Sequence, residues 1–219
     1  MLIASYVFFA LFALVSFVHL IFCFFEKDKA RKISKPFCVS FLVIAAILYK
    51  PDAPLIYVGA LLGVIGDIFL LKKQKIIFFL IGTFFFIGGH ICYLTQAILL
   101  INPSATIQWY VYLIFALFLL IFTFALYPIT RKKVGTPAFV GNFYMPFLLV
   151  LASLGIYLAV VNTNYVTGVL FAFGYLSFFI SDSILVYTSF FKDIKRRDFY
   201  IMIFYLLAEA LIVSGLLLA

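Results

Sequence analysis

The sequence predicts an all-α, polytopic membrane protein with about eight transmembrane helices. Of its 219 residues, 67% are apolar and only 11% are charged, whereas soluble domains carry about one-quarter charged residues. Thirty Phe and fourteen Tyr cannot all be buried inside a globule of this size, but a bilayer accepts apolar side chains on the outer surface of a protein. The composition therefore excludes a water-soluble fold.

Eight apolar stretches, separated by charged or Pro- and Asn-containing breaks, predict the helices of a single transmembrane domain over 1–219. Crossing about 30 Å of hydrocarbon takes about 20 helical residues, and most of the stretches reach that length. The second is short, because we expect it to begin at Pro36 with Ser34 as its cap and to end with Lys50 reaching the interface. The expected spans are 2–25, 36–49, 54–71, 76–100, 107–127, 136–161, 165–191 and 199–219.

The positions of the sixteen Lys and Arg residues predict how the chain is oriented. With eight spans, fifteen of the sixteen lie on odd-numbered connections, and treating 36–49 as non-spanning would put the first and third basic clusters on opposite faces. Basic connections stay on the cytoplasmic side, so we expect both termini on the non-cytoplasmic side of a bacterial inner (plasma) membrane. The basic clusters therefore account for the net charge of +8 as topology signals. We expect no nucleic-acid partner.

The two halves of the chain carry similar polar residues, which favours two parallel four-helix repeats. Asp67 precedes a basic connection and a helix with His90, and Asp182, 115 residues later, precedes a basic connection and a helix with Glu209. Parallel repeats of this kind occur in some transporters.

Three acidic residues, Asp67, Asp182 and Glu209, fall inside expected spans. A charged carboxylate near the bilayer centre costs at least a few kcal/mol, so such residues usually face a cavity or a partner and serve a function. At 1.5 Å per residue, Asp67 lies roughly 7 Å from the cytoplasmic end of its helix and the other two roughly 15 Å from theirs. We therefore expect one water-containing pocket that opens toward the inner leaflet.

Other polar and small residues occur at helical spacing around the three acids. His90 with Tyr93, and Tyr205 with Glu209, each share a helix face. Glycines at 59, 63 and 66 predict that a neighbouring helix approaches closely beside Asp67. The remaining polar candidates for lining the pocket are Asn142, Tyr144 and Ser181.

Each of these residues also has a purely structural interpretation. Asp67 is shallow enough to pair with Lys72 or to cap a neighbouring helix. His90 and Glu209 can instead hydrogen-bond each other as a packing contact. His19 is expected at the membrane interface rather than in a catalytic site. The three cysteines are scattered and predict neither a disulfide framework nor a metal site.

Four motifs in the chain resemble the YhhN-like family of lysoplasmalogenases. They are G-V-I-G-D-I-F-L-L at 63–71, H-I-C-Y at 90–93, S-D-S-I-L-V-Y at 181–187 and Y-L-L-A-E at 205–209. Enzymes of this family hydrolyse the vinyl ether bond of lysoplasmalogens to a fatty aldehyde and a glycerophospho-ethanolamine or -choline. The resemblance implies that Asp67 and Asp182 are the essential acid pair, with His90, Tyr93 and Tyr205 around the pocket. Glu209 stands where the family typically has Gln.

The resemblance and the buried acids together predict aspartate general acid/base catalysis on a lysophospholipid taken from the bilayer, with neither metal nor cofactor. A general acid protonates the carbon β to the ether oxygen, and a carboxylate stabilises the resulting cation and activates water. Two buried aspartates suit this chemistry, because their mutual repulsion lets the pair hold a single shared proton. We expect Asp182 to be the acid and Asp67 to orient the water, although the sequence also allows the reverse.

The main alternative is a proton-coupled lipid or small-molecule transporter that uses the same buried acids as a relay. Discontinuous helices would favour transport, and Gly88-Gly89 and Pro146 are the strongest candidates for breaks. A non-catalytic lipid-binding or assembly subunit is a third possibility, in which three embedded acids would have no explained role.

Overall fold

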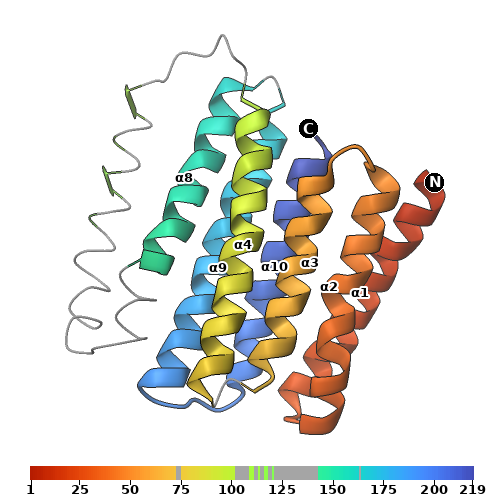
Figure 1. The fold of residues 1–219 in the computed structure, drawn as a ribbon, viewed down its shortest axis with the longest axis vertical. Coiled ribbons are helices and arrows are strands. Elements are labelled where there is room, and N and C mark those ends of the chain that lie inside the picture. The colour runs from red at the N-terminus through yellow and green to blue at the C-terminus, as the bar shows by residue number, and fades with distance from the viewer. Residues whose placement is uncertain are drawn as a thin grey trace.

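The described part of the chain is a bundle of seven α-helices in a computed structural model (Figure 1). Residues 1–72, 75–101, 143–162 and 164–219 are described, together with the single positions 109, 110, 113, 116, 117 and 120. The helices are α1 (Leu2–Phe24), α2 (Asp28–Tyr49), α3 (Pro54–Leu70), α4 (Ile76–Leu99), α8 (Met145–Val161), α9 (Tyr165–Phe190) and α10 (Arg197–Leu217).

Five of the described helices, α1, α2, α4, α9 and α10, are long and apolar enough to cross a membrane, and α3 and α8 are shorter apolar helices of 17 residues each. For the described residues, the prediction of an all-helical fold with several helices able to span a membrane is therefore confirmed. Most of the expected fifth span, 107–127, and residues 136–142 of the expected sixth lie outside the described residues. Both the total of eight spans and the parallel repeat stay predictions.

The buried face of α1 shows how the sequence suits a lipid solvent. Its buried residues are spaced by three, four or seven positions and are mostly polar or small, whereas exposed α1 residues such as Leu14 and Phe17 are large and apolar. This pattern is the reverse of a soluble amphipathic helix, because the lipid-facing side needs no polar groups. The buried set is Ser5, Phe12, Ser16, His19 and Cys23.

Helix α2 corrects one prediction, because it begins at Asp28 and not at Pro36. Pro36 lies inside the helix, and Ser34, expected as the cap, donates its hydroxyl to the Ala30 carbonyl at 2.9 Å. Asp28 occupies the first turn, where a negative charge is favourable, and pairs with Arg31 at 2.6 Å. The basic residues 29–35 therefore belong to the helix, and the second span is long enough to cross a membrane.

Helix α10 lies at the centre of the described bundle and packs against α1, α2, α3, α4 and α9. The expected close approach beside Asp67 is present between α3 and α4, where a Cβ added at Gly66 would lie 3.1 Å from the Gly82 carbonyl oxygen. The approach of α8 to α9 is closer still, since a Cβ at Gly168 would lie 2.0 Å from the Ala159 nitrogen. Small residues thus set the helix spacing, as in other membrane bundles.

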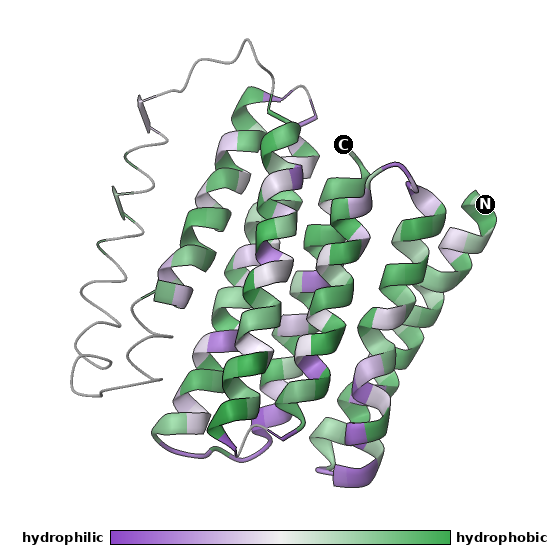
Figure 2. Ribbon diagram, viewed as in Figure 1, coloured by the Kyte–Doolittle hydropathy of each residue, from purple (hydrophilic) through white to green (hydrophobic). Residues whose placement is uncertain are grey.

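The connections α1–α2, α3–α4 and α9–α10 lie together at one end of the bundle, which is strongly hydrophilic, and both termini lie at the other end (Figures 1 and 2). Contacts join the α1–α2 and α9–α10 regions. Arg31 of α2 forms an ion pair with Asp198 of α10, and Glu26 accepts a hydrogen bond from the Arg196 backbone at 3.0 Å. We call this the basic end of the bundle; it is the end that the charge pattern predicts to face the cytoplasm.

Candidate active site

A cavity of about 420 Å³ lies at the basic end of the bundle. Charged residues of the α1–α2 and α9–α10 regions form its mouth, and polar side chains from within the helices form its inner wall. The residues at the mouth are Glu26, Asp28, Arg31, Lys32, Asp193, Arg196, Arg197 and Asp198; those deeper inside include His19, Lys35, Asp67, Phe86, Ser181, Asp182 and Tyr205, with the apolar Leu70, Leu185, Ile201 and Met202.

Asp67 and Asp182 both line this cavity, although 115 residues separate them in the sequence. Asp67 lies near the end of α3 and is 2% exposed, and Asp182 lies in the second half of α9 and is 8% exposed. The two carboxyls therefore meet in one pocket that opens at the basic end, which is the arrangement expected for an acid pair. The catalytic role of the two residues stays a prediction.

The partner of Asp67 is Lys35, not the Lys72 considered from the sequence. Lys35 Nζ lies 2.9 Å from Asp67 Oδ1, and the two side chains are 15% and 3% exposed. The pairing depends on the early start of α2, because Lys35 then lies inside the helix, on the same face as the buried Cys38 and Leu42. A cation at this distance favours the ionised form of the carboxyl.

Asp182 has a neutral partner, the hydroxyl of Tyr144, which donates to Asp182 Oδ2 at 2.5 Å. Tyr144 Oη in turn lies 3.2 Å from His90 Nε2, and the hydroxyl of Tyr175 lies 3.4 Å from His90 Nδ1. Because the Tyr144 proton is directed at Asp182, its oxygen accepts from Nε2–H, and Nδ1 accepts from Tyr175. One tautomer of His90 therefore satisfies the whole chain of hydrogen bonds behind Asp182.

Glu209 of α10 is buried at 2% exposure and accepts a hydrogen bond from the Tyr93 hydroxyl of α4 at 2.9 Å. The sequence also allows a direct hydrogen bond between His90 and Glu209. In the structure, each of the two side chains instead forms hydrogen bonds with tyrosines. Neither Glu209 nor Tyr93 is among the residues that line the cavity.

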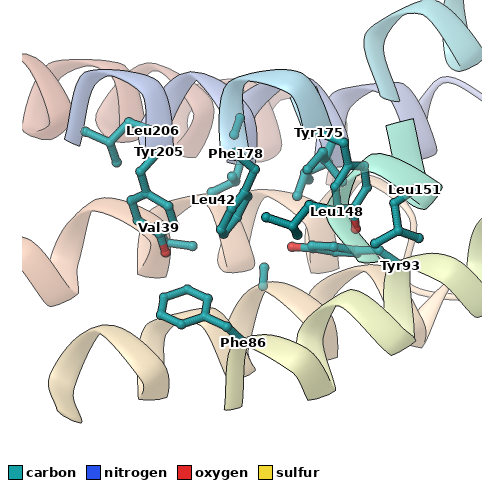
Figure 3. Close-up of a cluster of buried hydrophobic side chains, with 14 of the residues drawn as sticks. Val39, Leu42, Phe86, Tyr93, Leu148, Leu151, Tyr175, Phe178, Tyr205 and Leu206 are labelled. Carbon is teal, nitrogen blue, oxygen red and sulfur yellow. The ribbon is translucent and has the colours of Figure 1, made fainter. Parts of the chain in front are cut away.

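Three aromatic rings separate the cavity from these deeper contacts. Phe86, Phe178 and Tyr205 come from α4, α9 and α10 and pack edge to face, with centroid separations of 5.6 to 5.9 Å (Figure 3). Such perpendicular contacts are the favoured geometry for aromatic pairs. Phe178 also packs against the His90 ring at 4.6 Å. Tyr205 and Phe86 of this cluster also line the cavity.

The residues predicted to bind substrate fall into two groups. Ser181 and Tyr205 line the cavity, and the Ser181 hydroxyl donates to the Ile201 carbonyl at 3.0 Å. The others that the structure describes, His90, Tyr93, Tyr144 and Glu209, lie behind the cavity wall and contact one another or Asp182. Asn142 lies outside the described residues.

Sequence reasoning missed three residues of this region. Lys35 was assigned to a topology signal, Tyr175 carries no motif that distinguishes it from other buried aromatics, and His19 was expected at the interface. His19 is fully buried, lies 2.7 Å from Ser34 Oγ through Nδ1, and lines the cavity. The helical spacing of Lys35 to Cys38 and Leu42 is a signal that could have found the lysine.

No group of three His, Cys, Asp or Glu side chains within the described ranges is placed to hold a metal ion. Comparison with curated proteins and with solved structures gave no significant match. A model of the YhhN family matches residues 30–216, which run from the first turn of α2 to the last turn of α10 and include both aspartates of the cavity. The match covers well over half of the chain, and the protein therefore belongs to the YhhN family.

Proposed function

We propose that this protein is a membrane-embedded hydrolase that cleaves the vinyl ether bond of a lysoplasmalogen to a fatty aldehyde and a glycerophospho-ethanolamine or -choline. Membership of the YhhN family suggests a membrane protein of the lysoplasmalogenase type. The observation that carries the proposal is the meeting of Asp67 and Asp182, both buried, in one cavity at the basic end of the bundle.

The different partners of the two aspartates support a division of labour between acid and base. Asp67 is paired with the cation of Lys35, which favours a carboxylate. The contact of Asp182 with Tyr144 is a hydrogen bond from a neutral hydroxyl, so this carboxyl can carry a proton on Oδ1 while Oδ2 accepts from the tyrosine. Asp182 is then the general acid and Asp67 the general base, as the depths of the two residues in the sequence also favour.

The proposed reaction returns both groups to their starting state. Asp182 gives its proton to the carbon β to the ether oxygen, and the resulting oxocarbenium ion is captured by water, whose proton goes to Asp67. The hemiacetal then collapses: its hydroxyl proton passes to Asp182, the C–O bond to glycerol breaks, and Asp67 returns its proton to the glycerol oxygen. The sum is vinyl ether plus water to aldehyde plus alcohol, and no external acid is consumed.

The charges at the mouth suit the head group of such a lipid. Lys32 and Arg196 supply cations for the phosphate. Arg31 and Arg197, also at the mouth, form ion pairs with neighbouring aspartates. Apolar side chains in the deeper wall, such as Leu185 and Met202, offer contacts for the alkenyl chain next to the reacting bond.

The alternative of a proton-coupled transporter has less support from the described helices. A break in a membrane helix is typical of transporter binding sites. Gly88 and Gly89 lie inside the uninterrupted helix α4, whereas Pro146 lies at the start of α8, which directly follows two residues in π-helical conformation. Within the described ranges, the Gly88-Gly89 pair is therefore not a break inside a helix.

The experiment that tests the proposal is aldehyde release by the purified protein in detergent. A lysoplasmalogen is compared with its saturated ether analogue, and Asp67→Asn and Asp182→Asn are assayed beside the parent protein. We expect aldehyde from the vinyl ether only, and a loss of 100-fold or more in kcat in each variant. No aldehyde from the parent, or full activity in either folded variant, would contradict the proposal.

A further inference from the structure

The charged residues at the mouth of the cavity fall into two groups. Those of the first group form ion pairs with one another: Arg31, Arg197, Asp28, Asp193 and Asp198. Those of the second group, Glu26, Lys32 and Arg196, form no ion pair within the described part of the chain. The mouth therefore presents two cations and one carboxylate whose charges are not neutralised by neighbouring side chains.

Glu26 and Arg196 are held next to each other, although they belong to connections far apart in the sequence. Glu26 Oε1 accepts a hydrogen bond from the Arg196 backbone N–H at 3.0 Å. This contact uses one carboxylate oxygen and leaves Oε2 of the exposed glutamate for another partner. The Arg196 guanidinium lies over the Phe24 ring, 3.9 Å from its centroid. Because this contact covers the face of the guanidinium, the N–H groups at its edge stay available to an anion.

The backbone at both positions is strained. Glu26 has φ 53° and Arg196 has φ 57°, and they are the two non-glycine residues with positive φ in the described ranges. L-amino acids rarely adopt this left-handed region, and residues held in it are concentrated at ligand-binding and switch sites. The two strained residues are also the two ends of one hydrogen bond. The strain therefore places a carboxylate beside a cation at the mouth of the cavity.

A zwitterionic phospholipid head group complements these charges. Its phosphate and its nitrogen are joined by a two-carbon link, so a site for it needs a cation and a carboxylate side by side. The ammonium of ethanolamine donates N–H groups to a carboxylate, whereas the trimethylated nitrogen of choline has none and is typically bound by aromatic rings. The described residues at the mouth include no aromatic side chain, and the nearby Phe24 ring is already covered by Arg196.

We propose that Glu26 selects ethanolamine over choline as the head group of the lysolipid. Its carboxylate accepts from the ammonium, while Lys32 and Arg196 bind the phosphate. This inference rests on the proposed hydrolase function and narrows its substrate to one head group. With the head group at the mouth, the ether bond extends inward toward Asp67 and Asp182, which line the deeper part of the same cavity.

The test compares kcat/KM for ethanolamine and choline lysoplasmalogens that carry the same alkenyl chain. We expect the parent protein to prefer ethanolamine about fivefold, the effect of one exposed charge contact. Glu26→Gln keeps an oxygen that can accept from the Arg196 backbone but removes the charge, so most of the preference should disappear. Arg196→Gln should lower kcat/KM equally for both substrates and leave the preference intact, because both carry the phosphate.

Asp193→Asn is the matched control, since it removes a carboxylate from the same mouth but one that is paired with Arg197 at 2.8 Å. The ratio of the two kcat/KM values should not change in this variant. A fall of the ratio in Asp193→Asn as large as in Glu26→Gln would mean that only the total charge of the mouth matters, and would overturn the role of Glu26.

The remaining outcomes separate this inference from the hydrolase function. Equal kcat/KM for the two head groups in the parent would overturn the selection alone. So would an equal fall for both substrates in Glu26→Gln with a lower unfolding midpoint, because Glu26 would then only hold the two connections together. Binding of the saturated ether lysolipids with either head group requires no catalysis. If a parent protein that releases no aldehyde still binds the ethanolamine form more tightly, the head-group site stands and the hydrolase function is wrong.

Discussion

Replacing Lys35 with methionine tests the ion pair that distinguishes the two aspartates. The two charged atoms are 2.9 Å apart with little exposure, and at an effective dielectric constant of 20 their Coulomb attraction is about 6 kcal/mol. Desolvation offsets much of this, but removing one member leaves a buried charge unpaired, which typically costs about 3–5 kcal/mol. Methionine keeps the length of the side chain, so the change is mainly one of charge.

The assay is thermal unfolding in detergent for the parent, Lys35→Met, Asp67→Asn and the double variant. A change of 1 kcal/mol shifts the midpoint of a domain of this size by about 2–4 °C, so we expect Lys35→Met to lower it by about 10 °C. The double variant should lie closer to the parent, because no lone charge remains. Lys29→Met, at an exposed position of the same helix, is the control and should shift the midpoint little.

Aldehyde release gives a second reading of the same variant. Without its cation, the buried Asp67 carboxyl gains a proton and cannot accept one from water, so kcat should fall at least tenfold in the Lys35→Met protein that remains folded. A loss of less than about 1 kcal/mol in Lys35→Met, additive with that of Asp67→Asn, would refute the reasoning. The ion pair would then be as weak as an exposed one, and it would not be what keeps Asp67 ionised.

Four further variants probe the surroundings of the cavity. Tyr144→Phe removes the 2.5 Å hydrogen bond to Asp182; kcat for aldehyde release should fall about tenfold with KM unchanged, and a KM effect alone would indicate direct substrate binding instead. Glu209→Gln keeps an acceptor for the tyrosine on α4 and removes a buried acid, so the unfolding midpoint should hold or rise and activity should persist; a large loss of activity would assign Glu209 to the chemistry. Gly66→Ala places a Cβ 2.9 Å from a ring on α4, whereas the Cβ of Gly63→Ala meets nothing closer than 3.4 Å. The free energy of unfolding should therefore fall by about 1–3 kcal/mol in the first variant and change little in the second. Equal effects would contradict the packing of α3 against α4.

Most of the helix limits could be predicted because length and charge fix them in a membrane protein. The expected spans 2–25, 54–71, 76–100 and 165–191 agree with α1, α3, α4 and α9 to within one residue at each end. These helices are apolar over most of their length and are separated by charged or Pro- and Asn-containing breaks, so hydropathy along the sequence is enough to find their ends.

The start of α2 cannot be predicted in this way, because a proline after a run of charged residues favours a helix that begins at the proline. Pro36 removes one backbone N–H from the helix, but the turns before it still form, with Asp28 and Arg31 paired in the first of them. Polar residues at a membrane boundary lower the hydropathy without ending the helix. The pattern of apolar residues therefore reported where the lipid begins, and not where the helix begins.

The sequence predicts the acids of the candidate site and the tyrosines that contact two of them, Tyr93 and Tyr144, but not Lys35 or Tyr175. Asp67, Asp182 and Glu209 are conspicuous because a carboxylate inside an apolar stretch is expensive. Lys35 and Tyr175 are not conspicuous, since a lysine among basic residues and a tyrosine among many aromatics carry no such signal. Only the packing of helices distant in sequence shows that one contacts Asp67 and the other contacts His90.

The proposed division of roles between the two aspartates depends on the early start of α2. If the helix began at Pro36, Lys35 would lie in the connection between α1 and α2. Its side chain could then point into solvent, and its charge would not be held beside Asp67. Because the helix begins two turns earlier, Lys35 points inward on the same face as Cys38 and Leu42, and α2 presents a cation to one aspartate of the pair. Asp182 instead meets the neutral Tyr144. Two carboxyls in one cavity are thereby made chemically different, which is the condition for one to donate a proton while the other accepts one.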